Sequence, residues 1–351
     1  MEVNQISFEK PMTKTKPNVS VCIPSTVISD KNGYNLQQIT SIVYQIARAA
    51  TIFQIKEIVV LDIGQDQGDE IVAVAGGGKK IFGEEDLQED EQEQQHDRNR
   101  ISSSYLLASL LQFFITPPYL IKTIFNKINS QNPQIIKKFK YAYKLPKITT
   151  LPFMNDSKSH FKEGITVSKK SPKIIKKGKV VKNTKKIEVT KYVNIGEAEP
   201  LKLNIKQDIP INSRVTIDLT NKTIVSPKQA YGSEGNLSTF GYYVRICKKF
   251  SQIFTESSIE TGYSKSVFIN CDDYYLKHQK QVESLANYKP ENENIILIIG
   301  NYQDYQQSFQ KDKLNLLGVE NMIHMFDNKL DVPANVRIED CLLMALTKIN
   351  G

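Results

Sequence analysis

Apolar residues recur along both ends of this chain in patterns that predict alternating strands and helices. Residues 19–23 and 56–62 are short apolar runs typical of buried strands, and between them the apolar positions of 36–53 recur at helical spacing. The first sixty residues therefore predict a β-α-β unit with a right-handed crossover. The pattern returns near the C-terminus, with strands expected at 263–269, 295–299 and 322–326 and helices expected at 246–254, 274–285, 303–315 and 338–349.

The apolar run Ile295–Ile299 is the best candidate for the centre of a sheet. It is rich in β-branched residues, too short to span a membrane, and ends at Gly300. This strand and the expected strand at 322–326 each lead through a loop into a helix. Their carboxyl ends should therefore meet at one edge of a parallel sheet, where open α/β sheets bind ligands. Plain core packing remains an alternative, because such units occur in every α/β protein.

The middle of the chain has a different pattern. Short β-type pieces separated by polar turns, such as 164–167, 187–193 and 213–219, predict a small β-barrel between 154 and 245. Its segment 158–186 carries eleven lysines and one acidic residue, Glu163. A lysine-rich β-barrel is typical of nucleic-acid binding, although a solvated charged face is the ordinary alternative.

Candidate RNA contacts follow from this interpretation. Tyr242 and Arg245 lie where the barrel is predicted to close, at 240–245, although core packing explains Tyr242 equally well. The full candidate set is Lys169, Lys170, Lys173, Lys176, Lys177, Lys179, Tyr242 and Arg245.

Composition limits the class of protein and the domain organisation that the sequence allows. A hydrophobic content of 40% supports a real core, and the net charge of +8 is concentrated in the lysine-rich segment. The acidic, glutamine-rich stretch within 63–100 predicts a flexible loop. The expected organisation is a flexible 1–17, an α/β domain formed by 18–153 and 246–351, and an inserted β domain at 154–245. Four scattered cysteines without metal-site spacing, and no apolar run of membrane length, predict a soluble intracellular protein with reduced thiols and no metal.

Several sequence strings occur together in the order of one known group. They are Gln45–Phe53, Glu57–Val60, Pro118–Leu120, Phe161–Ile165, Gly241–Arg245 and Val336–Asp340. The chain resembles the SPOUT-superfamily, or α/β-knot, RNA methyltransferases of archaea and eukaryotes, in which an OB-like domain is inserted into the catalytic domain. The resemblance covers nearly the whole chain.

The resemblance implies an α/β fold with a C-terminal trefoil knot and an inserted OB-like domain. It also implies S-adenosylmethionine as cofactor, ribosomal RNA with a uridine base as substrate, a homodimer, and a nuclear or nucleolar location. Arg48 would orient the target nucleotide, although a surface salt bridge is an equally good interpretation of this residue. The implied cofactor-binding residues are Ile299, Gly300, Asn301, Met325, Phe326, Asn328, Ala334, Asn335, Val336 and Arg337.

The chain departs from the family pattern in three loops. Asn301 stands at the second position of an expected Gly-Gly, 331–335 replaces a glycine- and serine-rich loop, and 270–273 replaces a loop with hydroxyl side chains. These departures leave open an alternative function, that of a non-catalytic RNA-binding ribosome-assembly factor with the same fold.

Overall fold

The computed structural model describes residues 17–64, 101–128, 134–154, 160–168, 174–176, 179–181, 188–233, 238–271, 279–333 and 335–350. Most of the two segments predicted to be flexible, and the candidates Lys169, Lys170, Lys173, Lys177 and Ala334, lie outside these residues. Lys176 and Lys179 are described by their backbone alone.

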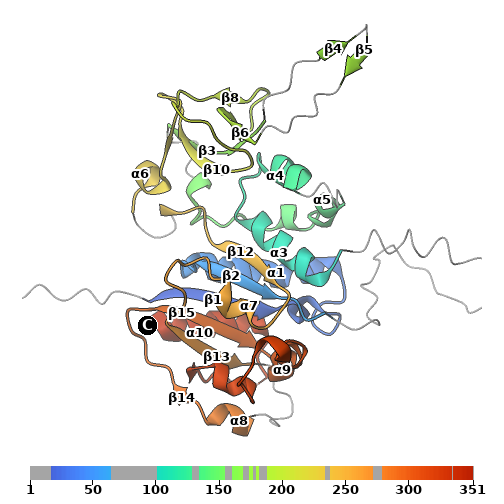
Figure 1. The fold of residues 1–351 in the computed structure, drawn as a ribbon, viewed down its shortest axis with the longest axis vertical. Coiled ribbons are helices and arrows are strands. Elements are labelled where there is room, and N and C mark those ends of the chain that lie inside the picture. The colour runs from blue at the N-terminus through green and yellow to red at the C-terminus, as the bar shows by residue number, and fades with distance from the viewer. Residues whose placement is uncertain are drawn as a thin grey trace, which may run out of the picture.

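A seven-stranded sheet forms the centre of the fold, and every neighbouring pair of its strands is parallel (Figure 1). The predicted α/β class with a parallel sheet is confirmed. In spatial order the strands are β12 (Tyr243–Cys247), β2 (Glu57–Leu61), β1 (Asn18–Pro24), β15 (Asn294–Gly300), β13 (Lys265–Asn270), β16 (Asn328–Lys329) and β14 (Ala286–Asn287).

Helices cover both faces of this sheet because successive strand residues point to opposite sides. Val21 and Ile23 belong to the core beneath one set of helices, whereas Cys22 between them belongs to the core on the other side. The first face is covered by α1 (Leu36–Ile52), α3 (Ser103–Phe114) and α10 (Ile338–Asn350). The second is covered by α7 (Gln252–Thr255), α8 (Gln279–Glu283), α9 (Tyr302–Lys311) and the 3-10 turn Met322–Met325. Double covering buries Ile295–Ile299 completely.

The middle of the chain forms a separate antiparallel sheet of five strands. Its order is β11 (Thr223–Val225), β10 (Arg214–Asp218), β3 (Phe161–Thr166), β7 (Tyr192–Asn194) and β8 (Leu201–Lys202). Two further antiparallel pairs are β4 (Ile174–Lys176) with β5 (Lys179–Val181), and β6 (Val189–Thr190) with β9 (Ile209–Pro210). The helix α6 (Pro227–Tyr231) follows β11. The predicted domain boundaries stay a prediction.

The helices α4 (Ile121–Ile128) and α5 (Ile135–Lys138), with the 3-10 turn Ala142–Lys144, lie between the two sheets (Figure 1). Tyr119 at the start of α4 donates its hydroxyl to the Glu163 carbonyl at 3.1 Å. The Asn194 amide donates to the Thr123 hydroxyl at 2.6 Å. These bonds attach the five-stranded sheet to the helices beside it.

Two predicted elements are wrong. Residues 322–326 form a 3-10 turn rather than a strand, because Asn321 caps the Ile323 amide and Met322, Ile323 and Phe326 enter the core at helical spacing. Residues 246–254 are not one helix. Tyr243–Cys247 instead forms the edge strand β12, paired with β2, and only Gln252–Thr255 is helical. Periodicity could not reveal this pairing because the two strands are almost two hundred residues apart.

Candidate functional site

Three neighbouring strands end at one edge of the parallel sheet. Asn270 at the end of β13 pairs with Gly300 at the end of β15, and the Cys271 amide donates to the Gly300 carbonyl at 3.2 Å. On the other side of β13, the Leu330 amide donates to the Phe268 carbonyl at 3.1 Å. The segments that follow β13, β15 and β16 therefore leave the sheet side by side, as a ligand site of this fold class requires.

Gly300 has no room for a side chain. A Cβ atom at this position would lie 2.9 Å from the Tyr305 ring and 3.0 Å from Pro24, and the φ angle of 158° is one that other residues rarely adopt. The end of β15 is therefore packed directly between α9 and the end of β1. Glycine is therefore the residue that permits this close approach of Tyr305 and Pro24.

The first turn of α9 is already satisfied by protein side chains. The Asn301 side chain accepts from the Gln303 amide at 3.0 Å, and the Asn270 side chain accepts from the Tyr302 amide at 3.1 Å. Asp304, in the same turn, adds a negative charge and accepts from the Thr26 hydroxyl at 2.6 Å. A phosphate cradle needs free amides at a helix N-terminus. The N-terminus of α9 therefore offers no such cradle to a phosphate group.

The loop before α10 lines the same edge. Arg337 donates to the Asn32 carbonyl at 3.0 Å, which fastens the loop to the segment after β1, and pairs with the buried Glu339 at 2.6 Å. Burial raises the pKa of the Glu339 carboxyl. Asn335 adopts a φ of 58°, the left-handed conformation that asparagine tolerates better than most residues. The substitution of asparagine into the expected glycine-rich loop thus retains an unusual backbone turn.

Met325 and Phe326 do not lie at this edge. The Met325 carbonyl accepts from the Ser266 hydroxyl at 3.0 Å, and Ser266 is at the beginning of β13. The Phe326 ring stacks on Phe268 in the core, with centroids 4.8 Å apart. Asn328 pairs with Val267, midway along β13. Because the strand begins later than predicted, the residues that leave its carboxyl end are Leu330–Val332, which were not among the predicted cofactor-binding residues.

Arg48 is exposed on α1, as the helical pattern predicted. The helix starts beside the carboxyl edge, after β1, and ends just before β2 at the amino edge. Arg48 lies twelve residues after Leu36, which corresponds to about 18 Å along the helix axis. Within one chain, the structure therefore separates Arg48 from Gly300 and its neighbours.

Tyr242 is buried, with 3% of its surface exposed. Its hydroxyl donates to the Leu111 carbonyl of α3 at 2.9 Å, and burial raises its pKa well above the ordinary tyrosine value. This geometry favours core packing over RNA contact, the two roles that the sequence allows for Tyr242.

Replacing Tyr242 by phenylalanine should lower the free energy of unfolding by about 1 kcal/mol, because one buried hydrogen bond is removed while the ring is kept. Urea denaturation followed by circular dichroism measures this change. RNA affinity, measured by fluorescence anisotropy, should stay at the wild-type value. Weaker RNA binding with unchanged stability would instead restore the contact interpretation.

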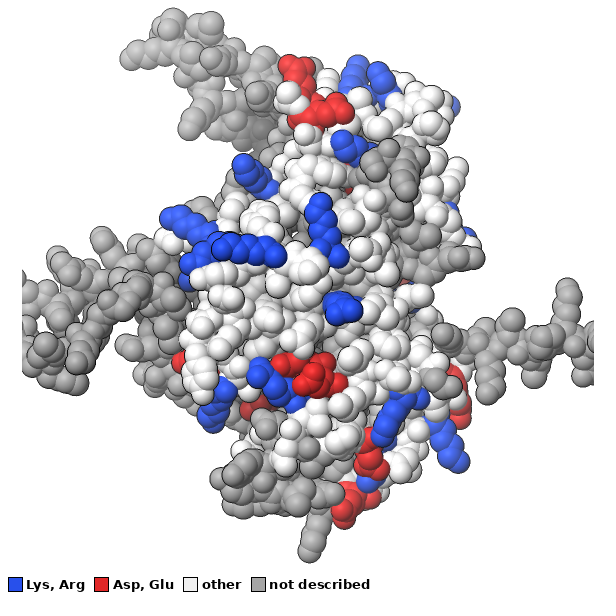
Figure 2. Space-filling model, turned by 180° about the vertical axis from the view of Figure 1, so that it is seen from behind, with Lys and Arg blue, Asp and Glu red and all other residues white. Residues whose placement is uncertain are grey.

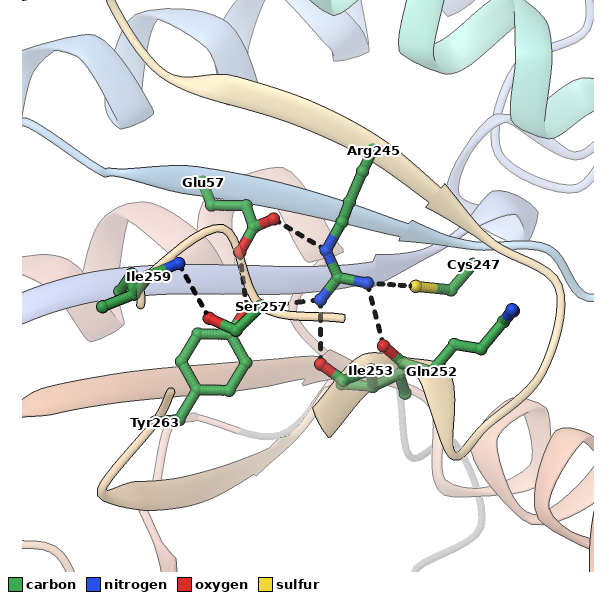
Figure 3. A network of polar contacts seen from close by, with 8 residues as sticks. All are labelled: Glu57, Arg245, Cys247, Gln252, Ile253, Ser257, Ile259 and Tyr263. Atoms are coloured by element: carbon green, nitrogen blue, oxygen red, sulfur yellow. Dashed lines mark hydrogen bonds and ion pairs between the residues drawn. The ribbon is translucent and has the colours of Figure 1, made fainter. Parts of the chain in front are cut away.

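Arg245 is the centre of a buried network on the α7 side of the sheet (Figure 3). Its Nε pairs with the Glu57 carboxylate at 2.7 Å, and its two terminal nitrogens donate to the carbonyls of Gln252 and Ile253 at 2.9 Å. Glu57 also accepts from the Tyr263 hydroxyl. The guanidinium thus connects β12 to β2 and to the carbonyls of α7, a structural role that sequence reasoning missed.

The neighbouring titratable groups of the network are neutral near pH 7. Burial raises the pKa of the Cys247 thiol to about 11, and burial together with the bond to Glu57 raises the pKa of Tyr263 to about 12. The charges of Glu57 and Arg245 therefore balance each other.

Among the residues that the structure describes, no three metal-binding side chains lie together. No described helix is both long enough and apolar enough to cross a membrane. All four cysteines are buried as free thiols.

Comparison with known proteins gives a consistent result over almost the whole chain. A family model described as "Putative RNA methyltransferase" matches residues 18–349. Two proteins of Saccharomyces cerevisiae, each named "Putative methyltransferase", are similar to the chain. One is 32% identical over 351 residues, covering 97% of this chain and 96% of the relative; the other is 33% identical, covering 93% and 86%. The 28S rRNA (uridine-N(3))-methyltransferase of Drosophila melanogaster is 26% identical, covering 96% of this chain and 63% of its own length.

Proposed function

The chain belongs to this RNA methyltransferase family of the SPOUT superfamily, and from that premise we propose that it methylates ribosomal RNA, with S-adenosylmethionine as methyl donor and a uridine base as acceptor. The names of its relatives from Drosophila melanogaster, Mus musculus and Homo sapiens, all 28S rRNA (uridine-N(3))-methyltransferases, support this substrate.

One observation carries the proposal: three adjacent strand ends meet at an edge that suits a cofactor without phosphate. Gly300 lets Tyr305 and Pro24 pack closely against the end of β15, and the first amides of α9 are occupied by Asn270 and Asn301. Leu330, Val332 and Val336 supply partly buried apolar surface suited to an adenine ring. The residues that would hold S-adenosylmethionine are Ile299–Asn301, Leu330–Val332 and Asn335–Arg337.

When bound, S-adenosylmethionine supplies an electrophilic methyl group. A uridine ring nitrogen must lose its proton to solvent water before it can accept this group, so a nearby cation that stabilises the resulting anion favours transfer. Arg48 is the residue we assign to this role and to orienting the nucleotide. Positioning supplies most of the remaining rate enhancement.

The inserted segment is proposed to be an OB-like domain that grips the RNA backbone through its lysines; of the predicted range 154–245, Tyr243–Arg245 belong instead to β12 of the parallel sheet. The single acidic residue of the lysine-rich segment, Glu163, is fully buried and pairs with Arg214 at 2.6 Å. It therefore holds β3 to β10, and its negative charge is balanced by Arg214 inside the sheet. Lysine contacts with phosphates give affinity with little sequence preference.

A homodimer with a trefoil knot completes the proposal. The late strand β16 is inserted between the earlier strands β13 and β14, and α10 then returns to pack on α1, as a threaded C-terminus would.

The neighbouring helices α1 and α10 expose apolar side chains, with Ile52 45%, Leu343 46% and Met344 39% exposed. If two copies pair through this face, Arg48 of one chain can approach the cofactor edge of its partner. A nucleolar location follows from the proposed substrate.

Titration calorimetry with S-adenosylmethionine tests the cofactor assignment. The full chain should bind this ligand with saturable heat, whereas ATP should give none, because the first amides of α9 are already bonded to Asn270 and Asn301. The matched control is an Asn301→Trp variant, which places a large ring at the proposed cofactor site. This variant should abolish the heat. No binding at millimolar cofactor, with RNA affinity intact, would favour the non-catalytic assembly factor instead.

A further inference from the structure

A second basic surface lies outside the lysine-rich insert, on the segment that contains α5. The segment 137–147 carries five lysines, and no aspartate or glutamate occurs anywhere from 101 to 155. We define the α5 surface by its lysines and tyrosines, which are Lys137, Lys138, Lys140, Tyr141, Tyr143, Lys144 and Lys147.

The α5 surface is held rigidly by apolar anchors. Ile135, Phe139 and Ala142 are buried, and the Phe139 ring contacts Phe113 of α3 at 4.8 Å and Phe125 of α4 at 4.7 Å between centroids. Because these anchors point inward, Lys137, Lys140, Lys144 and Lys147 are exposed. The positive charges are thus carried on a fixed scaffold, which lowers the entropic cost of binding a ligand.

Aromatic rings alternate with the charges on this surface. The ammonium groups of Lys140 and Lys144 lie 4.7 and 5.8 Å from the centre of the Tyr141 ring, so one ring makes cation–π contacts with two lysines. Tyr143 rests edge-on against Phe113 and leaves 53% of its surface exposed. Lysines bind phosphates and an exposed ring can stack on a base, a combination that suits a nucleic acid better than an acidic protein.

The positive charge of the α5 surface is not balanced by carboxylates in the described part of the chain. Among the ion pairs between residues that the structure describes, none includes Lys137, Lys138, Lys140, Lys144 or Lys147. In Figure 1, α4 and α5 lie at mid-height on the right; in the turned view of Figure 2, blue side chains gather on the corresponding left side without red among them. Mutually repelling charges on a rigid surface favour an anionic partner.

The position of the α5 surface connects the two proposed working parts of the protein. The turn Ala142–Lys144 contacts α1, which carries Arg48, and also contacts α3. The neighbouring helix α4 is bonded to the five-stranded sheet through Thr123 and Asn194. An RNA strand that follows the lysines of α5 could therefore extend from the insert toward α1.

We propose that the α5 surface is a second RNA-binding site, which holds a single-stranded segment next to the target nucleotide between the insert and α1. The proposal deepens the proposed function and rests on it for the identity of the RNA. The site binds phosphates through its lysines and stacks a base on Tyr143.

The test compares two full-length variants with equal reduction of charge. In one, Lys137, Lys140 and Lys144 are changed to glutamine; in the control, the exposed Lys248, Lys249 and Lys289 are changed in the same way. The probe is an oligouridylate of about 20 nucleotides, long enough to span more than one site. Loss of one lysine–phosphate contact should reduce the magnitude of the slope of log K against log salt concentration by about 0.7. The α5 variant loses three lysines, so the magnitude of its slope should be smaller by about 2. Its affinity should fall at least tenfold, whereas the control should match wild type.

A Tyr143→Leu variant separates stacking from packing, because leucine keeps the apolar contact with Phe113. Its affinity should fall roughly tenfold with an unchanged salt slope. A wild-type slope in the α5 variant, or polyglutamate binding as tightly as the oligouridylate, would overturn the proposal. Calorimetry with S-adenosylmethionine on the same variants keeps the two proposals distinguishable. A reduced slope without cofactor binding contradicts only the catalytic function, and cofactor binding with an unchanged slope contradicts only the α5 site.

Discussion

A mixed dimer of two inactive variants should recover about half of the wild-type methyl-transfer rate, because one of its two symmetric sites regains every residue. The variants are Arg48→Ala and Asn301→Trp. The structure separates the two positions within one chain, since Arg48 is about 18 Å along α1 from Leu36, the first residue of the helix. If the proposed dimer is correct, each site combines Arg48 of one chain with Asn301 of its partner.

Each variant by itself should reduce turnover at least 100-fold, for different reasons. Arg48→Ala removes the cation proposed to orient and stabilise the target base, an interaction of the kind worth about 100- to 1,000-fold in rate. Asn301→Trp obstructs the proposed cofactor site at the end of β15. It also removes the cap on the Gln303 amide, which costs about 1 kcal/mol and leaves the fold intact.

The experiment is co-expression of the two chains with different affinity tags, purification of the mixed dimer, and measurement of methyl transfer to RNA. The control pairs Arg48→Ala with a chain carrying both substitutions, which leaves no complete site and should give no recovery. If the first mixed dimer is as inactive as its parents, Arg48 does not act across the dimer.

Removing the guanidinium of Arg245 should cost about 3–5 kcal/mol in the free energy of unfolding, because Glu57 would remain as a buried charge without its partner. The cost should be large for three reasons that the geometry makes visible. Glu57 is fully buried, the ion pair is 2.7 Å long, and the carbonyls of Gln252 and Ile253 would each lose the bond from Arg245. Urea denaturation of Arg245→Ala measures the change.

Two controls distinguish a buried pair from charge removal in general. Lys191→Ala breaks the exposed pair with Asp208, 3.5 Å long, and should cost less than about 1 kcal/mol. The double variant Glu57→Gln, Arg245→Met should be more stable than Arg245→Ala, because no unpaired charge remains buried. Equal destabilisation by Arg245→Ala and Lys191→Ala would contradict the structural role assigned to this network.

Local patterns predicted much of the fold, and their failures have a physical cause. The helices α1 and α10 and the strand β15 were predicted within one or two residues, because each has a long or strongly biased apolar pattern. The apolar run 322–326 was misassigned because a short run suits a strand and a turn equally well. Asn321 and the Asp327–Ser266 contacts decide between them.

Some residues of the candidate site could likewise be predicted from a local pattern, whereas others depend on contacts between distant segments. Ile299–Asn301 could be predicted because a buried strand that ends in glycine is readable in the sequence. The place of Met325 and Leu330 depends on the register between β13 and β16, which joins segments about sixty residues apart. The three departures from the family pattern also gained meaning only in three dimensions. Asn270 and Asn301 organise the first turn of α9, and Asn335 supplies a left-handed turn.

By itself, the sequence determined the fold class, the family and the buried central strand, because these depend on composition and on spacing between near neighbours. Only the tertiary structure decided that Arg245 pairs with Glu57, that Tyr242 is a core residue, that Arg48 lies away from Gly300 within one chain, and that the lysines of α5 form one surface. Each of these is a relation between distant segments. The residue type fixes the chemistry of a side chain, but its contact partner depends on packing between segments that are far apart in the sequence.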